Sequence, residues 1–194
     1  MRPTTERLEN IESKINTDDF RQNKGSSNEV GYYVFDFPAK DELIVREWVR
    51  YWQRKNNPDV DGFQFVAFDL YDIMIDILES KSYLEKCFEF EEKGGIERVV
   101  TATGRMLRLS EGAGGLIVEH IKEYTPENSI VFLTGVGKCY PILRAHKVLN
   151  NLHQKLDHVP VIMLYPGEYD GRELVLFGSD TEHNYYWAQR LVSS

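Results

Sequence analysis

The chain has 194 residues, of which 42% are hydrophobic and 28% are charged, and its formal net charge is −8. A chain of this length is typical of one domain with its own hydrophobic core, so we expect a single domain over residues 1–194. The acidic charge argues against stable binding to DNA by the protein alone, and no apolar run in the sequence is long enough to cross a bilayer. The polar start of the sequence predicts no signal peptide, and two cysteines without motif spacing favour a reducing cytoplasm.

The N-terminal part of the sequence predicts a helix and then the first strand. Apolar residues recur at helical spacing between residues 5 and 16, so we expect residues 1–28 to form a peripheral helix and a polar loop. Residues 31–37 (GYYVFDF) are apolar and aromatic, which favours a strand. Pro38 ends this strand, because proline cannot continue a hydrogen-bonded ladder.

A second helix, predicted over residues 41–55, has two different faces. Apolar side chains recur at three- and four-residue spacing on one face, which comprises Ile44, Val45, Trp48, Val49, Tyr51 and Trp52. The opposite face carries a row of arginines, each four residues from the last: Arg46, Arg50 and Arg54. Such a row either contacts phosphates or the carboxylates of a partner, or is a solvated helix face, which is the commoner case.

The middle of the sequence continues the alternation of strand and helix. Residues 64–68 (QFVAF) predict the second strand, and residues 69–80 predict the next helix. Asp69 is the expected N-cap of this helix, and Asp72 favours its positive N-terminus. Residues 81–124 have a helical pattern that glycines interrupt.

The stretch that organises the chain covers residues 128–152. Residues 130–133 form a continuous apolar run, which predicts a strand buried on both faces. A glycine loop follows at residues 134–138, and Pro141 is expected to open a helix. A buried strand that continues through such a loop into a helix is the basic unit of a parallel α/β sheet, and these sheets bind ligands at such loops.

The loop at residues 134–138 only partly resembles a phosphate-binding loop. A Walker A motif would require glycine at the position of Phe132 and serine or threonine at the position of Cys139. A dinucleotide-binding fingerprint would require glycine where Tyr140 stands. What remains is a short loop that could hold an anion, made by Gly135, Gly137 and Lys138. The alternative is a connector whose glycines permit positive φ.

The C-terminal part of the sequence predicts a hairpin. Residues 159–164 (VPVIML) form a further buried strand, residues 165–171 have strong turn chemistry, and residues 174–177 return as a strand. We expect residues 183–192 to end the chain as a helix. Together these elements predict a three-layer α/β domain with a mostly parallel central sheet, several flanking helices and a C-terminal hairpin at the sheet edge.

Few residues suggest catalysis. Asp36 and Asp69 each follow a predicted parallel strand, and with a nearby lysine they could hold magnesium. Helix capping is the favoured explanation for Asp69. The histidines lack the spacing of a metal site, and the sequence contains no nucleophile elbow. We therefore expect no catalytic residues, no cofactor and no metal.

Aromatic residues near the predicted sheet edge indicate a surface for a partner protein. The chain has 11 Tyr and 3 Trp, more than one core of this size needs, and these residues anchor interfaces well. The expected partner surface combines aromatic residues with the arginine row: Tyr165, Tyr169, Tyr186, Trp187, Arg46, Arg50 and Arg54.

Several phrases spread over most of the chain resemble one protein family. The most specific of them are FLTGVGK at residues 132–138, YPILR at 140–144, HKVLNNL at 146–152 and YPG followed by YDG at 165–171. They resemble the BrxB family of the BREX bacteriophage-exclusion systems. The resemblance extends from about residue 23 to residue 192, which is nearly the whole chain.

The resemblance implies a cytoplasmic component of a multi-protein system that methylates host DNA and blocks phage replication. Neighbouring components include a DNA methyltransferase, a large ATPase and PglZ, and the family supplies no catalytic residues to transfer to this sequence. We therefore expect a non-catalytic adaptor that holds other defence proteins together, with PglZ as its direct partner. The alternative is a phosphate-, nucleotide- or metal-binding enzyme with a degenerate phosphate loop at residues 134–138.

Overall fold

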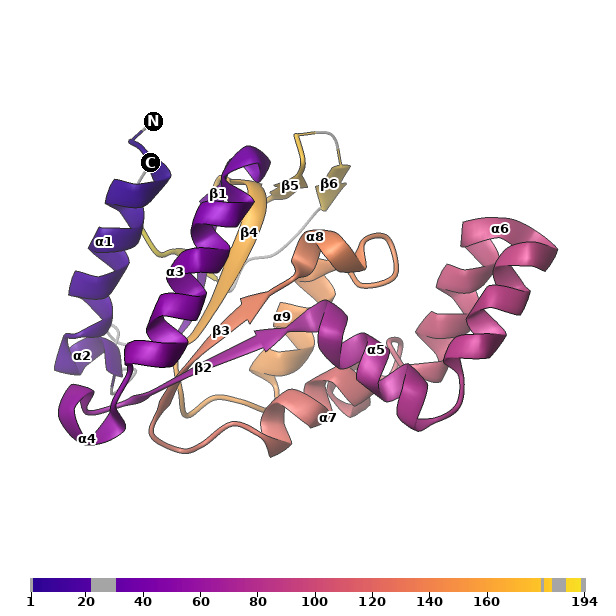
Figure 1. Ribbon diagram of the computed structural model, residues 1–194, viewed down its shortest axis with the longest axis horizontal. Helices are drawn as coiled ribbons and strands as arrows, with labels where there is room; N and C mark the ends of the chain where they lie inside the picture. The colour runs from indigo at the N-terminus through magenta and orange to yellow at the C-terminus, as the bar shows by residue number, and fades with distance from the viewer. Residues whose placement is uncertain (1, 22–30, 179, 183–187, 193–194) are drawn as a thin grey trace.

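The fold is built on a parallel β-sheet that helices cover on both faces (Figure 1). The computed structural model describes residues 2–21, 31–178, 180–182 and 188–192. In the parallel part of the sheet the strands follow the order β2-β3-β4-β1-β7. Their bounds are Tyr32–Phe37 for β1, Gln64–Asp69 for β2, Ser129–Thr134 for β3, Val161–Tyr169 for β4 and Gln189–Arg190 for β7.

The helices divide between the two faces of the sheet according to the core that their buried side chains join. One face packs against α1 (Thr4–Ile15), α2 (Asp18–Arg21) and α3 (Glu42–Lys55). The other face packs against α5 (Leu70–Ser80), α6 (Leu84–Met106), α7 (Leu116–Glu123), α8 (Val136–Cys139) and α9 (Ala145–His153). The α/β domain with a mostly parallel sheet and helical layers, predicted from the sequence, is confirmed.

Short helices complete the connections between these elements. They are η1 (Ala39–Asp41), α4 (Pro58–Asp61) and η2 (Gly112–Gly114). Among the residues that the structure describes, no helix combines the length and the apolar character that crossing a membrane requires.

The strand predicted to be central, β3, lies between β2 and β4. Its side chains alternate between the two cores: Ile130 and Phe132 pack with α1 and α3, whereas Val131 and Leu133 pack with the helices of the other face. All four are fully buried. A continuous apolar run is required here because each face of the strand meets a helical layer.

A buried ion pair joins the N-terminal helix to β1. Arg7 of α1 is 1% exposed, and its guanidinium donates to the Asp36 carboxylate (Nη2 to Oδ1, 2.6 Å) and to the Asp36 carbonyl (2.6 Å). The second carboxylate oxygen accepts hydrogen bonds from Arg190 of β7 (3.0 Å) and from the backbone N–H of Tyr169 in β4 (3.2 Å). These partners offset the cost of burying the charge, and they connect α1, β1, β4 and β7.

Helix α1 is therefore part of the outer layer that covers one face of the sheet. Its apolar side is buried at Leu8, Ile11 and Ile15. It also packs along α3, where Glu12 Oε1 accepts hydrogen bonds from the indole N–H groups of Trp48 (3.2 Å) and Trp52 (3.1 Å). The sequence pattern shows an amphipathic helix, but it does not show which surface covers the apolar side.

The C-terminal hairpin is present, but its first strand is not an edge strand of the parallel sheet. Residues 167–169 of β4 pair antiparallel with β5 (Leu174–Leu176), which pairs with β6 (Asp180–Glu182). The first part of β4 lies between β3 and β1. The hairpin thus extends a central strand beyond the carboxyl end of the sheet.

Two helices predicted near the C-terminus differ from the structure. The helix after β3 begins at Ala145 and not at Pro141, because the single turn α8 comes first and Tyr140 is extended (φ −65°, ψ 136°), as residues before proline prefer. Of the helix predicted at residues 183–192, the described part contains strand β7, which pairs with β1. That prediction is wrong for these residues, and residues 183–187 lie outside the described part of the chain.

The buried face of α3 is narrower than predicted. Val45, Val49 and Trp52 are buried, whereas Ile44 and Tyr51 are 42% and 45% exposed. The three buried residues follow the i, i+4, i+7 line that contacts the sheet. Residues one position away from this line point sideways and reach solvent.

Helix α6 projects from the body of the domain as a helical hairpin (Figure 1). Its chain reverses at Gly94 and Gly95, and Gly95 has φ +64°, a conformation that glycine adopts at little cost. The Cys87 thiol and the Thr103 hydroxyl lie 3.5 Å apart across 16 residues of sequence. The two halves therefore lie side by side, and we call residues 84–106 the α6 arm.

Replacing Asp36 by alanine is expected to lower the free energy of unfolding by about 3 kcal/mol or more, because Arg7 would remain buried without its carboxylate. Denaturant unfolding measures this loss. The control is Asp18→Ala, which removes an exposed ion pair with Arg21 and should cost less than about 1 kcal/mol. Equal losses in the two variants would show that the buried ion pair has no special role.

Candidate functional site

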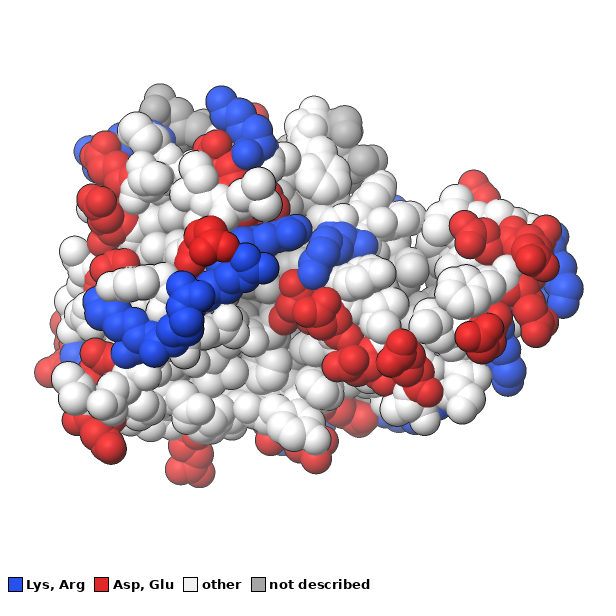
Figure 2. Space-filling model, in the orientation of Figure 1, with Lys and Arg blue, Asp and Glu red and all other residues white. Residues whose placement is uncertain are grey.

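A cleft opens at the carboxyl ends of β2 and β3, between α3 and the start of α5. Its volume is about 440 Å³. Side chains near the ends of neighbouring strands form its floor: Phe37, Ala67, Thr134 and Leu164. Figure 2 shows a row of basic and a row of acidic side chains on this face of the molecule. The fold therefore forms a charged cleft in the region where parallel sheets bind ligands.

The basic wall of the cleft belongs to α3. Within the described part of the chain, Arg46 and Arg50 line the cleft, whereas Arg54 does not. Arg46 Nε pairs with Glu42 (3.0 Å), and Arg50 Nη1 pairs with Glu47 (2.6 Å). The arginine row of the sequence is thus divided, because only two of its three members face the cleft.

The acidic wall belongs to β2 and α5. Asp69 caps α5 as predicted, since its Oδ1 accepts hydrogen bonds from the N–H groups of Tyr71 (3.0 Å) and Asp72 (3.3 Å). Asp72 and Asp76 continue this wall along α5. Their i, i+4 spacing predicts a shared helix face but not what lies opposite, so sequence reasoning missed that they face the arginines of α3.

Lys138 lies at the end of the acidic wall. Its ammonium contacts Asp69 Oδ2 (2.5 Å) and Asp72 Oδ1 (3.5 Å). Partial burial lowers the pKa of Lys138, but the hydrogen bond and charge of Asp69, together with the charge of Asp72, raise this pKa in net above the ordinary lysine value. The ammonium is therefore charged at neutral pH, and two carboxylates neutralise it.

The glycine loop at residues 134–138 is crowded by a carboxylate. Gly135 has φ +74°, and a Cβ at this position would lie 2.1 Å from Asp69 Oδ1. A Cβ at Gly137 would lie 2.6 Å from the ring of Phe177. An anion at this loop would meet the Asp69 charge at short range and be repelled. We interpret Gly135 and Gly137 as residues that permit a tight turn and close packing.

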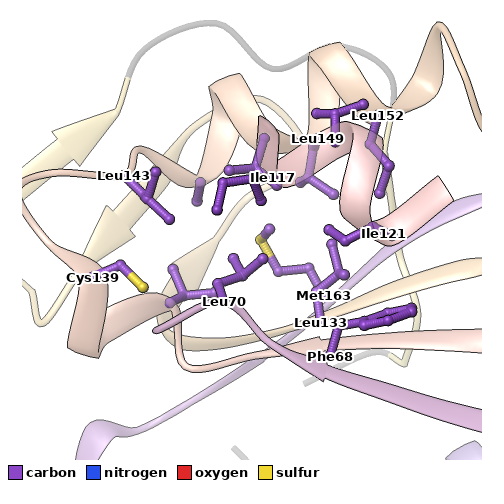
Figure 3. Packing of buried hydrophobic residues seen from close by; sticks show 14 of the residues in the cluster. Phe68, Leu70, Ile117, Ile121, Leu133, Cys139, Leu143, Leu149, Leu152 and Met163 are labelled. Carbon is purple, nitrogen blue, oxygen red and sulfur yellow. The ribbon is translucent and has the colours of Figure 1, made fainter. Parts of the chain in front are cut away.

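Cys139, which stands where a phosphate loop has its hydroxyl, points into the core beside Leu70 (Figure 3). It is 1% exposed. Burial, and after it the charge of Asp69, raise the pKa of this thiol to about 12. The thiol is therefore protonated at neutral pH and is a poor nucleophile.

The two aspartates considered as magnesium ligands lie apart. Asp69 ends β2, whereas Asp36 belongs to β1, and β3 and β4 separate these strands. Asp36 is also occupied by Arg7 and Arg190. The strand order therefore keeps Asp36 and Asp69 from sharing a magnesium ion, the alternative to helix capping that their positions in the sequence left open. Over the residues that the structure describes, no three His, Cys, Asp or Glu side chains gather in a way that could hold a metal ion.

The structure also corrects the predicted aromatic surface. Tyr165 and Tyr169 are 0% and 1% exposed, because β4 is a central strand with helices on both faces of the sheet and the hairpin at its end. The phenol of Tyr169 donates to the carbonyl of Ala188 (2.6 Å). These two tyrosines therefore cannot anchor a partner, and Tyr186 and Trp187 lie outside the described residues.

Comparisons with known proteins assign the chain to a family. A family model described as BREX protein BrxB matches residues 66–191. A Bacillus cereus protein named BREX protein BrxB is 46% identical over 192 residues, which is 99% of each chain. The chain belongs to the BrxB family. An Escherichia coli protein with the same name is 33% identical over 96% of this chain and 90% of its own length.

Membership of the BrxB family confirms the resemblance found in the sequence phrases. The region that the family model matches contains the end of β2, all of α5 and the loop with Lys138, and the alignments with both relatives extend over nearly the whole chain. No solved structure matches this chain.

Substitutions at Asp69 separate its two roles in this BrxB family member. Asp69→Ala removes both the N-cap and the partner of Lys138, and is expected to lower the free energy of unfolding by about 1–2 kcal/mol. Asp69→Asn keeps a capping oxygen and loses only a partly exposed ion pair, so it should cost less than about 1 kcal/mol. Denaturant unfolding compares the variants. Equal losses would mean that the ion pair, and not the cap, dominates.

The raised pKa of the Cys139 thiol predicts that the protein loses stability at alkaline pH. The pKa of this thiol is about 12 in the folded protein, against the ordinary 9.0. Between pH 9 and 12 the thiol ionises in the unfolded chain but not in the folded protein, so the unfolded chain is favoured as the pH rises. The contribution of Cys139 to stability is therefore complete below pH 9 and is lost over this range. At pH 10 the free energy of unfolding should fall by roughly 1 kcal/mol for this reason. Denaturant unfolding at pH 7 and pH 10 measures the fall, which should be smaller in Cys139→Val. A fall of the same size in both proteins would contradict this account.

Proposed function

We propose that this member of the BrxB family acts in phage defence by the BREX system, as a non-catalytic adaptor that holds other defence proteins together. PglZ is the direct partner that we propose. The proposal is supported by family membership over nearly the whole chain, since both relatives carry the name BREX protein BrxB. A component of a multi-protein system needs a surface that binds its partners.

The α6 arm is the structural feature that best supports the proposed adaptor role. It joins the core of one helical layer through Cys87 and Val99 and projects from there beyond the sheet (Figure 1). Phe88 and Ile96 of the arm are 52% and 46% exposed, and burying these apolar side chains against a partner would stabilise a complex.

The state of the charged and nucleophilic groups supports a non-catalytic role. Asp69 caps α5 and pairs with Lys138. The raised pKa of Lys138 keeps its ammonium charged, which makes it a poor nucleophile at neutral pH. The Cys139 thiol is buried and protonated. These groups stabilise the fold, and none of them is activated for chemistry.

We further propose that the adaptor works in the cytoplasm, where its cysteines remain thiols; both are free and buried. The net charge of −8 disfavours binding of the isolated protein to DNA. Contact with DNA would therefore come through other components of the system.

A pull-down from cells that carry the complete defence system tests the adaptor role. The tagged wild-type protein should capture PglZ, and the double variant Phe88→Ser/Ile96→Ser should bind it about thirtyfold more weakly, a loss of about 2 kcal/mol. Val60→Ser is the matched control, because Val60 is 78% exposed on α4 at the opposite end of the domain (Figure 1). This control should bind like the wild type.

Thermal melting establishes that each variant is folded. If the wild type captures no other defence component, the adaptor role is wrong. If the folded double variant captures PglZ with wild-type affinity, the α6 arm is not the partner surface.

A further inference from the structure

The charged cleft lies at the carboxyl ends of the parallel strands, between one helix from each of the two layers that cover the sheet. After β1 the chain enters α3, which covers one face, whereas after β2 it enters α5, which covers the other. Open parallel sheets bind small ligands in crevices outside the carboxyl ends of their strands. The cleft volume of about 440 Å³ is within the usual range of small-molecule sites.

The α3 wall of the cleft can hold an oxyanion. Arg46 and Arg50 are one helical turn apart and both line the cleft. Arg46 uses its Nε–H for Glu42, and Arg50 uses Nη1 for Glu47, so each guanidinium retains further N–H donors. Guanidinium groups bind phosphate oxygens through paired hydrogen bonds, and the exposed ion pairs within α3 are weak competitors.

The α5 wall offers hydrogen-bond acceptors. Asp72 contacts Lys138 at 3.5 Å, and Asp76 has no hydrogen-bond or ion-pair partner among the described residues. Ionised carboxylates accept hydrogen bonds from hydroxyl and amino groups. Between the two walls the cleft is lined by apolar side chains that suit a flat ring: Val45, Val49, Ala67, Ile73, Leu164 and Pro166.

We propose that this cleft binds a nucleoside phosphate, with the phosphate on Arg46 and Arg50 and the hydroxyl or amino groups of the nucleoside on Asp72 and Asp76. Charge determines the orientation, because a phosphate placed on the α5 wall would be repelled by the carboxylates there. The apolar floor between the walls packs against the base. The proposed polar contacts are on α3 and α5, whereas the glycine loop at residues 134–138 borders the cleft and supplies none of them. The proposal does not depend on the adaptor role.

Isothermal titration calorimetry of the full chain with AMP, GMP, CMP and UMP tests the proposal. At least one of them should bind with a Kd at or below about 1 mM, the weak end of measurable affinity. The double variant Arg46→Ala/Arg50→Ala should weaken that binding about tenfold or more. Arg54→Ala, on the same helix but outside the cleft, is the matched control and should change the Kd less than about twofold.

The acidic wall has its own test. Asp76→Asn should weaken binding of the nucleotide while leaving the weaker binding of inorganic phosphate unchanged or tighter. Glu79→Gln, an exposed change on α5 outside the cleft, should alter neither. Thermal melting establishes that the variants are folded.

Three results would overturn the proposal. In the first, none of the four nucleotides binds at millimolar concentration. In the second, Arg54→Ala weakens binding as much as the double variant, which would indicate unspecific attraction of charge. In the third, inorganic phosphate binds as tightly as the nucleotide, which would mean that the α5 wall and the floor make no contribution.

Discussion

The buried carboxylate of Asp36 is the constraint on which the arrangement of the chain ends depends. Its partners are Arg7, 29 residues before it, and Arg190, 154 residues after it. A buried charge without such partners is unfavourable by several kcal/mol, so any fold that buries Asp36 must bring α1 and β7 to β1. These contacts also occupy the carboxyl end of β1. The charged cleft forms instead toward β2 and β3, where no comparable ion pair fills the space among the described residues.

The cleft and the α6 arm are joined by a single helix, α5, of 11 residues. Helix α5 supplies Asp72 and Asp76 to the acidic wall, and the chain enters the arm shortly after α5 ends at Ser80. The buried side of α5 packs in the core, where Leu70 contacts the strand residues shown in Figure 3. One rigid element thus supports both surfaces that the proposals concern, while its own charges remain on the solvent side.

Local patterns in the sequence were enough to predict most of the secondary structure and one feature of the site. The strands β1 to β4 follow from apolar runs, and the central place of β3 follows from a run that is apolar on both faces. The Asp69 cap was also predictable, because capping involves only a side chain and the next few backbone N–H groups. Such features depend on residues that are neighbours in the chain, and a single sequence displays them directly.

Other features depended on the strand order β2-β3-β4-β1-β7. This order separates Asp36 from Asp69, and it buries Tyr165 and Tyr169 by placing β4 in the centre of the sheet. It also sets the arginines of α3 opposite the aspartates of α5, although a solvated helix face is the commoner case for such an arginine row. Strand order results from pairing between segments far apart in the chain, and each segment has the same apolar pattern whichever neighbour it receives. The periodicity of one sequence therefore shows that a face is charged or apolar, but not which surface that face will meet.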